Sequence, residues 1–413
     1  MSRPKVALIV TAYFFGSHAD VLGTKLIEGY EWHGEHVDAR VEVVSMYLEQ
    51  LGAHLRDRPS PEPDIGIDIA KRHHVPLYPT VGEAMGCGTG GVAVDGVVII
   101  GEHGDYESNE LGQTLYPRRR LFDAAVATMA GGGRYVPIFN DKGLSYSAQD
   151  ALAMVATARR LGIPLVAGST IPLTWRVPAG TQWPSGEAMT DAVAVGYGEA
   201  ESYGFHTLEG LQAHVERRRG GETGVIAVRA YSGDEAVRAC TDGTVDAELL
   251  DRALGSLELD VDARARAVRG VAEVYSIEYA DGLSAAAVTC HDEVANWGAA
   301  CRGPGHEMVC QMYLPGASPG KPSDHFVFLA RQIESAVLTG LEPSPVERTL
   351  LTTGILDAAM RSRHRAGERV CTPELSDIAY GPVADIADTG VFASFAEPVR
   401  SIERRPARVS GLS

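Results

Sequence analysis

Four carboxylates and one histidine are concentrated in the segment EHGDYESNE, residues 102–110. Imidazole and carboxylate groups on one loop suit Zn²⁺, Mn²⁺ or Fe²⁺. Glu102, His103 and Asp105 are therefore candidate metal ligands. The alternative is a hydrogen-bonded carboxylate cluster that the arginines of the run 118–120 neutralise without an ion. Both hypotheses place charged groups at the same loop.

A second polar segment, Asp141-Lys142-Gly143, follows the apolar run YVPIFN, just as the 102–110 loop follows DGVVII. Continuous apolar runs of this length are typical of strands buried on both faces of a parallel sheet. Open α/β sheets bind their ligands beyond the carboxyl ends of such strands. We therefore expect Asp141 and Lys142 to lie in one crevice with the 102–110 loop.

The pattern of the whole chain predicts an α/β fold with two domains. Apolar runs alternate with helix-like stretches through the first part, which indicates βαβ units and a parallel sheet. Later segments, such as VAEVYSIEYADGLSAAAVTCHD with its DG turn, are typical of antiparallel strands. We predict a Rossmann-like domain over residues 1–170, an α+β domain with a mostly antiparallel sheet over 171–395, and a C-terminal tail over 396–413. The expected strands of the first domain are 6–10, 41–48, 75–79, 95–101, 135–141 and 163–169, and the main expected helices are 20–32, 118–133, 147–162, 201–218, 325–340 and 345–367.

Composition excludes several classes of protein. The 413 residues carry a formal charge of −17, from 37 Lys and Arg against 54 Asp and Glu, which disfavours nucleic acid as a partner. The basic runs at 118–120 and 216–219 are interpreted as solvated helix faces. No apolar run reaches the roughly 18 residues that span a bilayer, and no signal peptide is recognisable. Six cysteines without CxxC spacing favour a reducing cytoplasm.

The order of these pieces resembles the glucose-fructose oxidoreductase / inositol dehydrogenase family. The segment RYVPIFNDKGLSYSAQDALAMVATARRLGIPLVAGS is similar to that family's strand, Glu-Lys-Pro turn, helix and following strand, with Asp141-Lys142-Gly143 at the turn. SYGFHTLEGL is similar to its helix with a catalytic histidine, and HFVFLARQIESAVLTG to one of its closing helices. The resemblance implies a Rossmann domain paired with an α+β substrate domain.

The resemblance also implies roles for individual residues. Lys142 and His206 fall on the catalytic positions, and we expect them to face each other across the crevice as a proton-transfer pair. Arg176, beside Trp175, matches the family's arginine after the sixth strand and would hold an anionic or hydroxylated substrate by its planar guanidinium. Tyr106 and Asp141 complete the predicted substrate site. A homo-oligomer is expected through the exposed sheet face of the second domain.

The family's dinucleotide loop is altered here. In IVTAYFFGSHAD, His18-Ala19 match the family, but the first two glycine positions are Val10 and Ala12. Side chains at these positions obstruct a diphosphate. The residues that would contact a nucleotide are Thr11, Ala12, Tyr13, Phe14 and, on the second strand, Ser45, where the family has an acidic residue close to the strand end. We predict weak or absent nicotinamide binding.

Two enzymatic hypotheses follow, with a non-enzymatic scaffold or sensor as a third that the retention of Lys142 and His206 disfavours. The first is an oxidoreductase of this family that acts on a small hydroxylated substrate with NAD(P). The second is a lyase, hydrolase or isomerase on the same fold that works by acid/base or metal-assisted chemistry without the nucleotide. Its divalent ion (Zn, Mn or Fe) would be held by Glu102, His103, Asp105 and His206, with Asp141 nearby.

Overall fold

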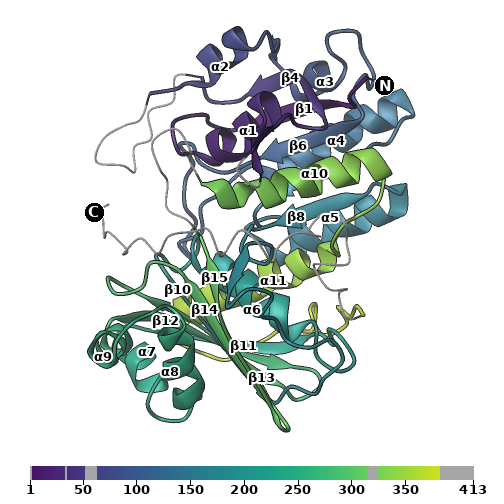
Figure 1. Ribbon diagram of the computed structural model, residues 1–413. Helices are drawn as coiled ribbons and strands as arrows, with labels where there is room; N and C mark the ends of the chain where they lie inside the picture. Colours follow the sequence, from purple (N-terminus) through teal and green to yellow (C-terminus); the bar gives the residue numbers. More distant parts are fainter. Residues whose placement is uncertain (1, 33–34, 52–62, 315–322, 382–413) are drawn as a thin grey trace.

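The computed structural model describes residues 2–32, 35–51, 63–314 and 323–381, and two sheets dominate it (Figure 1). The first is a six-stranded parallel sheet with the order β5-β4-β1-β6-β7-β8. Counted along the parallel strands alone, this is the order 3-2-1-4-5-6 of a dinucleotide-binding fold. The strands are β1 (Lys5–Val10), β4 (Glu42–Leu48), β5 (Leu77–Tyr78), β6 (Gly96–Ile100), β7 (Ile138–Asp141) and β8 (Leu165–Gly168).

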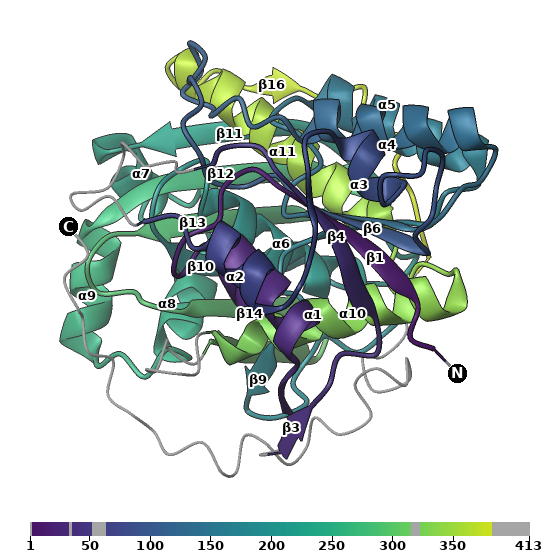
Figure 2. The same ribbon diagram turned by 90° about the horizontal axis from the view of Figure 1, so that it is seen from above.

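Helices cover both faces of this sheet, as the continuous apolar strands require. Along β1, Ala7 and Ile9 point into the core that contains α3 (Val81–Met85), α4 (Arg118–Gly132) and α5 (Ala148–Leu161). The alternate residues Val6, Leu8 and Val10 point into a second core with α1 (Thr24–Glu28) and α10 (Val327–Thr339). Figure 2 shows α10 and the α4–α5 pair on opposite sides of the strands. The short helix α2 (Gly66–Arg72) contributes Ile69 to the second core.

The helix after β1 is much shorter than predicted. The stretch 20–32 was expected to be one helix, but a π-helical turn (Ala19–Gly23) runs into α1, which ends at Glu28. Gly29 stops it with a φ of +84°, and a Cβ there would lie 2.5 Å from the carbonyl oxygen of Val37. Residues Tyr30–Trp32 then form β2, paired with β3 (Glu35–Val37). The other expected helices are present, and the Ser147 cap and Gly162 stop of α5 are confirmed.

The second sheet has eight strands in the order β16-β11-β12-β13-β10-β14-β15-β9. It is antiparallel except for the β10–β13 pair, so the predicted fold class is confirmed. The DG turn at Asp281-Gly282 joins β12 and β13 as expected. The strands are β9 (Trp175–Val177), β10 (Asp191–Tyr197), β11 (Val225–Ser232), β12 (Val271–Tyr279), β13 (Ser284–Cys290), β14 (Trp297–Gly303), β15 (His306–Tyr313) and β16 (Val370–Cys371).

Both faces of the central strands of this sheet are covered. Helix α6 (Gly204–Val215) packs on one face, against β10, β13 and β14. Helices α7 (Asp234–Ala239), α8 (Ala247–Gly255) and α9 (Val261–Arg269) form an apolar core with the other face. Among the described residues, these helices cover the central strands on both faces; the homo-oligomer stays a prediction.

The chain returns to the first sheet near its end. Helix α10, preceded by the short η2 turn (Asp324–Phe326), packs beside β8 and α1, whereas α11 (Val346–His364) lies between α5, α6 and β11. The chain therefore passes between the part that contains the first sheet and the part that contains the second sheet more than once. The predicted boundary at residue 170 stays a prediction, and the predicted tail over 396–413 lies outside the described residues.

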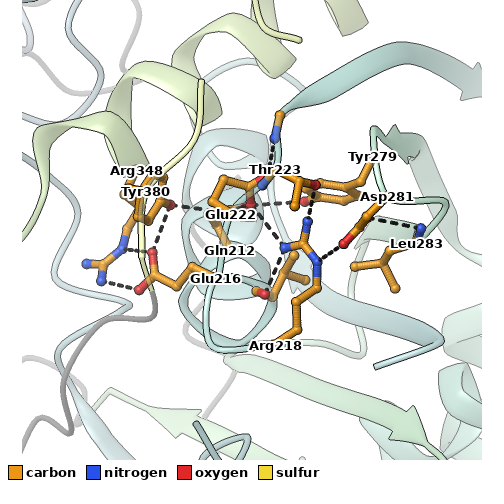
Figure 3. A network of polar contacts seen from close by, with 12 residues as sticks. Gln212, Glu216, Arg218, Glu222, Thr223, Tyr279, Asp281, Leu283, Arg348 and Tyr380 are labelled. Carbon is orange, nitrogen blue, oxygen red and sulfur yellow. Dashed lines mark hydrogen bonds and ion pairs between the residues drawn. The ribbon is translucent and has the colours of Figure 1, made fainter. Parts of the chain in front are cut away.

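A buried ionic network joins α6, α11 and the second sheet (Figure 3). Arg348 of α11 donates to both carboxylate oxygens of Glu216, and the Tyr380 hydroxyl donates to the same group. Arg218 pairs with Glu222 at 3.2 Å and with Asp281 at 2.7 Å. The interpretation of the 216–219 run as a solvated face was therefore wrong for its first three residues, which are at most 3% exposed.

Candidate active site

A pocket opens where β6 and β7 end, between the parallel sheet, α6 and α11. Its cavity volume is about 20 Å³, and the free space of about 410 Å³ around it includes open solvent. Charged groups of both signs and several hydroxyl and amide groups line it together with a few apolar side chains. The lining residues are Glu102, Gln113, Tyr116, Arg118, Lys142, Gly143, Ser145, Tyr146, Glu201, Ser202, Phe205, Thr353, Leu356 and Asp357.

Glu102 is the anionic centre of this pocket. Its carboxylate accepts a hydrogen bond from Lys142 Nζ at 2.8 Å and a second from Arg118. Burial is the largest influence on the pKa of Glu102 and raises it, but Lys142 and Arg118, helped by His103 and His18, lower that pKa well below its usual range. The carboxylate is therefore ionised between two cations. The structure favours the ion-free cluster hypothesis, with Arg118 as its neutralising arginine.

The backbone around Lys142 is shaped to turn its side chain into the pocket. Lys142 has a φ of +59°, and its N–H and C=O both bond to Gly168 at the end of β8. Gly168 has a φ of +121°, and a Cβ there would lie 2.7 Å from Glu209 of α6. Positive φ at a lysine is uncommon, and such strain gathers at functional sites. The local backbone thus brings two strand ends and α6 into close contact.

Glu201 is a second carboxyl of the pocket and has a different environment. Burial raises its pKa to about 6, and Glu102 adds to this rise, while Arg118, Lys142 and the Thr114 backbone N–H oppose it. The guanidinium of Arg118 lies 4.9 Å from the centre of the Tyr116 ring. Two carboxyls in one pocket are thus driven to opposite protonation behaviour, a pattern typical of acid/base sites.

His206 lies in the first turn of α6, next to Phe205, which lines the pocket. Its Nδ1 is 2.7 Å from the Ser169 hydroxyl. Burial lowers the pKa of His206 well below its usual range, and Lys142 and His18 lower it further. Lys142 is therefore within electrostatic reach of the imidazole. Their opposed placement across the crevice is in line with these contacts and stays a prediction.

Rings from several elements pack together beside the pocket. His18 Nδ1 bonds to the fully buried Asp141 at 2.6 Å, so the carboxylate of Asp141 is bonded to a residue of the protein. The His103 ring packs edge-on against Phe14 and His18, and the backbone φ of His103 is +68°. Phe326 also packs edge-on against His18. These rings fill the space between the ends of β1, β6 and β7.

Three backbone N–H groups of the loop after β1 donate to side chains of the same loop. Gly16 N–H donates to Asp20 Oδ2 at 2.8 Å, and the N–H groups of Phe14 and Asp20 both donate to the Ser17 hydroxyl at 3.2 Å. In a dinucleotide-binding fold the N–H groups at this helix start bind the diphosphate. Here a carboxylate of the chain, 8% exposed, takes that role.

The side chains of this loop are also packed inward. Thr11 is fully buried and donates to the carbonyl oxygen of Glu102 at 2.9 Å. Ala12, Tyr13 and Phe14 are each 1% exposed, and the Tyr13 hydroxyl is 2.6 Å from Thr24 Oγ1. The residues predicted to contact a nucleotide therefore form the core beneath the loop, and the loop does not fit a diphosphate in the usual mode.

The acidic residue after β4, where the family binds the ribose of the nucleotide, is also bonded to side chains of this chain. Strand β4 runs to Leu48, so the predicted Ser45 is buried inside the strand, and Glu49 rather than Ser45 follows its end. Glu49 accepts hydrogen bonds from Arg120 at 2.6 Å and from Tyr106 at 2.8 Å. Tyr106 is thereby directed toward Glu49, although its ring contacts the pocket residue Tyr116. The acid at the strand end is neutralised by the protein itself.

Arg176 and Trp175 do not line the pocket. Arg176 is 6% exposed, and its guanidinium donates to the carbonyl oxygens of Ile171, Pro172 and Thr174. Trp175 packs edge-on against Phe328 of α10. Arg176 therefore ties a turn to β9, which leaves its predicted role in substrate binding without structural support.

The predicted metal site receives no support either. Within the described ranges, no group of three or more His, Cys, Asp or Glu side chains is placed to hold a metal ion. Glu102 is committed to Lys142 and Arg118, and His206 to Ser169. Asp105 is exposed, and its N–H bonds to Gln50. The four predicted ligands thus have different partners.

Several pocket residues were not among the predicted site residues. Glu201 was not singled out from the sequence, and the 118–120 run that contains Arg118 was interpreted as a solvated face, although Arg118 is 5% exposed. Gln113 donates to Tyr146 O at 2.7 Å and to Asp357 at 3.3 Å, so it links the loop before α4 to α11. The density of charge in residues 102–120 was a signal for such a site, but no motif marked α11.

Comparison with solved structures places this geometry in a known fold. GenD2 from gentamicin A biosynthesis, solved with NAD, is 16% identical, with 90% of this chain and 97% of that chain covered and a TM-score of 0.54. Scyllo-inositol dehydrogenase from Lactobacillus casei is 10% identical over 90% and 98% of the two chains, also with a TM-score of 0.54. An oxidoreductase from Agrobacterium radiobacter, solved with NAD+, L-tartaric acid and magnesium, is 12% identical over 90% and 98%, with a TM-score of 0.53.

The chain therefore has the fold of the sugar and inositol dehydrogenases. The resemblance to the glucose-fructose oxidoreductase / inositol dehydrogenase family that the sequence indicated is confirmed at the level of the fold. No family model and no curated protein matches the sequence. Within the described residues, no helix is long and apolar enough to cross a membrane.

Proposed function

We propose that this protein is an enzyme with the oxidoreductase fold that transfers a proton on a small hydroxylated substrate. In this proposal it does not bind a nicotinamide nucleotide in the way the family does. The observation that carries the proposal is the convergence of Glu102, Arg118, Lys142 and Glu201 on one pocket. At the same time, Ser17 and Asp20 occupy the N–H groups that would bind a diphosphate.

The charges of the pocket suit proton abstraction next to a carbonyl group. Glu201, with its pKa raised to about 6, can accept a proton from carbon near neutral pH. The electron pair of the broken C–H bond then moves to the carbonyl oxygen and forms an enolate. The ammonium group of Lys142, held beside Glu102, stabilises that oxygen by its charge. If the deprotonated carbon bears a hydroxyl, its O–H proton moves to the enolate oxygen, and Glu201 returns the abstracted proton to the former carbonyl carbon, which gives the isomeric carbonyl compound. If a hydroxyl stands on the β carbon, it leaves as water with the proton held by Glu201, and the product is an α,β-unsaturated carbonyl compound.

The polar groups of the lining fit a substrate rich in hydroxyls. Ser145, Ser202 and Thr353 offer hydroxyl groups, while Gln113 and Asp357 offer an amide and a carboxyl. Such groups donate and accept hydrogen bonds in the pattern that a polyol or sugar requires.

A nicotinamide-dependent dehydrogenase is the second candidate. The strand order of the first sheet favours it, as does the likeness to GenD2, which was solved with NAD. In this case the nucleotide would have to enter without the N–H groups of the β1 loop. The two candidates differ in whether turnover needs the nucleotide.

The test is proton exchange in D₂O. The protein is incubated with inositols, keto-inositols, hexoses and ketohexoses, with and without NAD+ or NADP+, and deuterium incorporation is followed by ¹H NMR. We expect exchange or rearrangement without nucleotide, lost in Glu201→Gln and kept in the matched control Glu199→Gln, which changes an exposed side chain. Turnover that occurs only with a nucleotide would establish the dehydrogenase instead.

A further inference from the structure

The imidazole of His206 is fixed on one side by a serine that the sequence did not single out. Ser169 follows β8, is 4% exposed, and has its hydroxyl 2.7 Å from His206 Nδ1. Among the described residues, the hydrogen-bond partner of the ring is Ser169 and not a carboxylate.

The other hydrogen bonds of Ser169 hold it in one place. Its N–H donates to Glu209 at 3.1 Å, and Glu209 lies on α6 one turn after His206. Glu209 is itself held by the hydroxyls of Thr349 and Thr352 of α11. The serine is therefore connected to the helix that carries the imidazole.

The same contacts decide which way the Ser169 hydroxyl points. Its oxygen already accepts a hydrogen bond from the Ile171 N–H at 3.1 Å. Either group could donate in the contact with His206 Nδ1, but the single hydrogen of the hydroxyl also needs an acceptor, and among the described hydrogen bonds of Ser169 the one atom placed to accept it is His206 Nδ1. A neutral imidazole that accepts at Nδ1 carries its proton on Nε2.

We propose that Ser169 is a positioning residue that keeps His206 as the Nε2–H tautomer, so that His206 acts on substrate as a hydrogen-bond donor and not as a base. The role of His206 toward a substrate rests on the proposed function, whereas the tautomer does not. Because burial and Lys142 lower the pKa of His206, the ring is neutral at pH 7 and the donor is an uncharged imidazole.

This tautomer limits what His206, which neighbours the pocket residue Phe205, can do to a substrate. A neutral Nε2–H can donate to a carbonyl oxygen as negative charge develops there, beside the ammonium group of Lys142. It cannot also take a proton at that nitrogen. The base must then be another group, and Glu201 is the carboxyl of the pocket whose pKa is near neutrality.

The tautomer can be measured without any substrate. In protein labelled with ¹⁵N-histidine, two-bond ¹H–¹⁵N spectra at pH 7 show which ring nitrogen carries the proton. The His206 signals are assigned by their absence in His206→Gln. We expect Nε2–H to exceed Nδ1–H by at least about tenfold. Loss of one neutral hydrogen bond in Ser169→Ala should lower that ratio about fivefold, whereas the hydroxyl of Ser169→Thr should maintain it.

The outcomes separate this inference from the proposed function. A proton on Nδ1 in the wild type, or an unchanged ratio in Ser169→Ala, would overturn the role of Ser169 while leaving the nucleotide question open. Turnover that needs NAD+ would overturn the proposed function and leave the tautomer as measured. If Ser169→Ala does not fold, the wild-type spectrum alone still decides whether Nε2 carries the proton.

Discussion

Replacing Glu201 by glutamine should make the protein more stable at neutral pH. The native pKa of about 6 lies above the ordinary value of 4.5, so the native state binds the proton more tightly than the unfolded state. The ionised carboxylate is therefore unfavourable in the native protein. This cost is absent below about pH 4.5, grows as pH rises, and is complete above about pH 6.

The size of the effect follows from the shift. A rise of the Glu201 pKa from 4.5 to about 6 corresponds to at most about 2 kcal/mol of lost unfolding free energy when the carboxyl is ionised. Glu201 keeps some contact with solvent at the pocket, so we expect about 1–2 kcal/mol. Glutamine has nearly the same shape and no charge, so it removes this cost.

Urea unfolding at pH 4 and pH 7.5 measures the difference. The free energy of unfolding of Glu201→Gln, relative to wild type, should rise by about 1–2 kcal/mol between the two pH values. Glu199→Gln changes an exposed neighbour and should show no such pH dependence. A relative stability of Glu201→Gln that falls as pH rises would refute the reasoning, because it would mean that Arg118 and Lys142 stabilise the charged form more than burial opposes it.

Two further predictions concern the buried charges. Arg348→Met alone should destabilise the protein by about 3–5 kcal/mol in urea unfolding, because it leaves Glu216 buried without its cation, and adding Glu216→Leu should recover most of the loss; equal losses in the single and double variants would contradict this. Lys142→Met should raise the pKa of His206 in an NMR titration, because the ammonium group lowers it, while Lys5→Met should not; an unchanged His206 pKa would show that Lys142 and His206 do not share a crevice.

The fold was predictable where one stretch of sequence carries the whole signal. The runs VALIV and DGVVII are long enough and apolar enough to define strands buried on both faces, and they became β1 and β6. The capping serine and terminal glycine of α5 are local signals as well. The helix expected over 20–32 was wrong because Gly29 turns the chain and a strand pairing follows it.

The site was harder to predict because its groups are paired over long distances in sequence. Glu102 and Lys142 were expected together, since parallel strands end at one edge of a sheet. The burial of Glu216 depends on Arg348, which lies 132 positions further along the chain. Ser169 carries no pattern of its own, and its hydrogen bond to His206 arises only when β8 meets α6.

The most direct test of the account is a nucleotide titration of the wild-type protein. NADH and NADPH are added separately, and binding is followed by their fluorescence and by calorimetry. Because Asp20 and Ser17 occupy the N–H groups of the β1 loop, we predict a Kd weaker than about 1 mM, or a binding free energy no better than about −4 kcal/mol. A Kd near 1 μM, about −8 kcal/mol, for either nucleotide would contradict the claim that this fold works here without its nicotinamide.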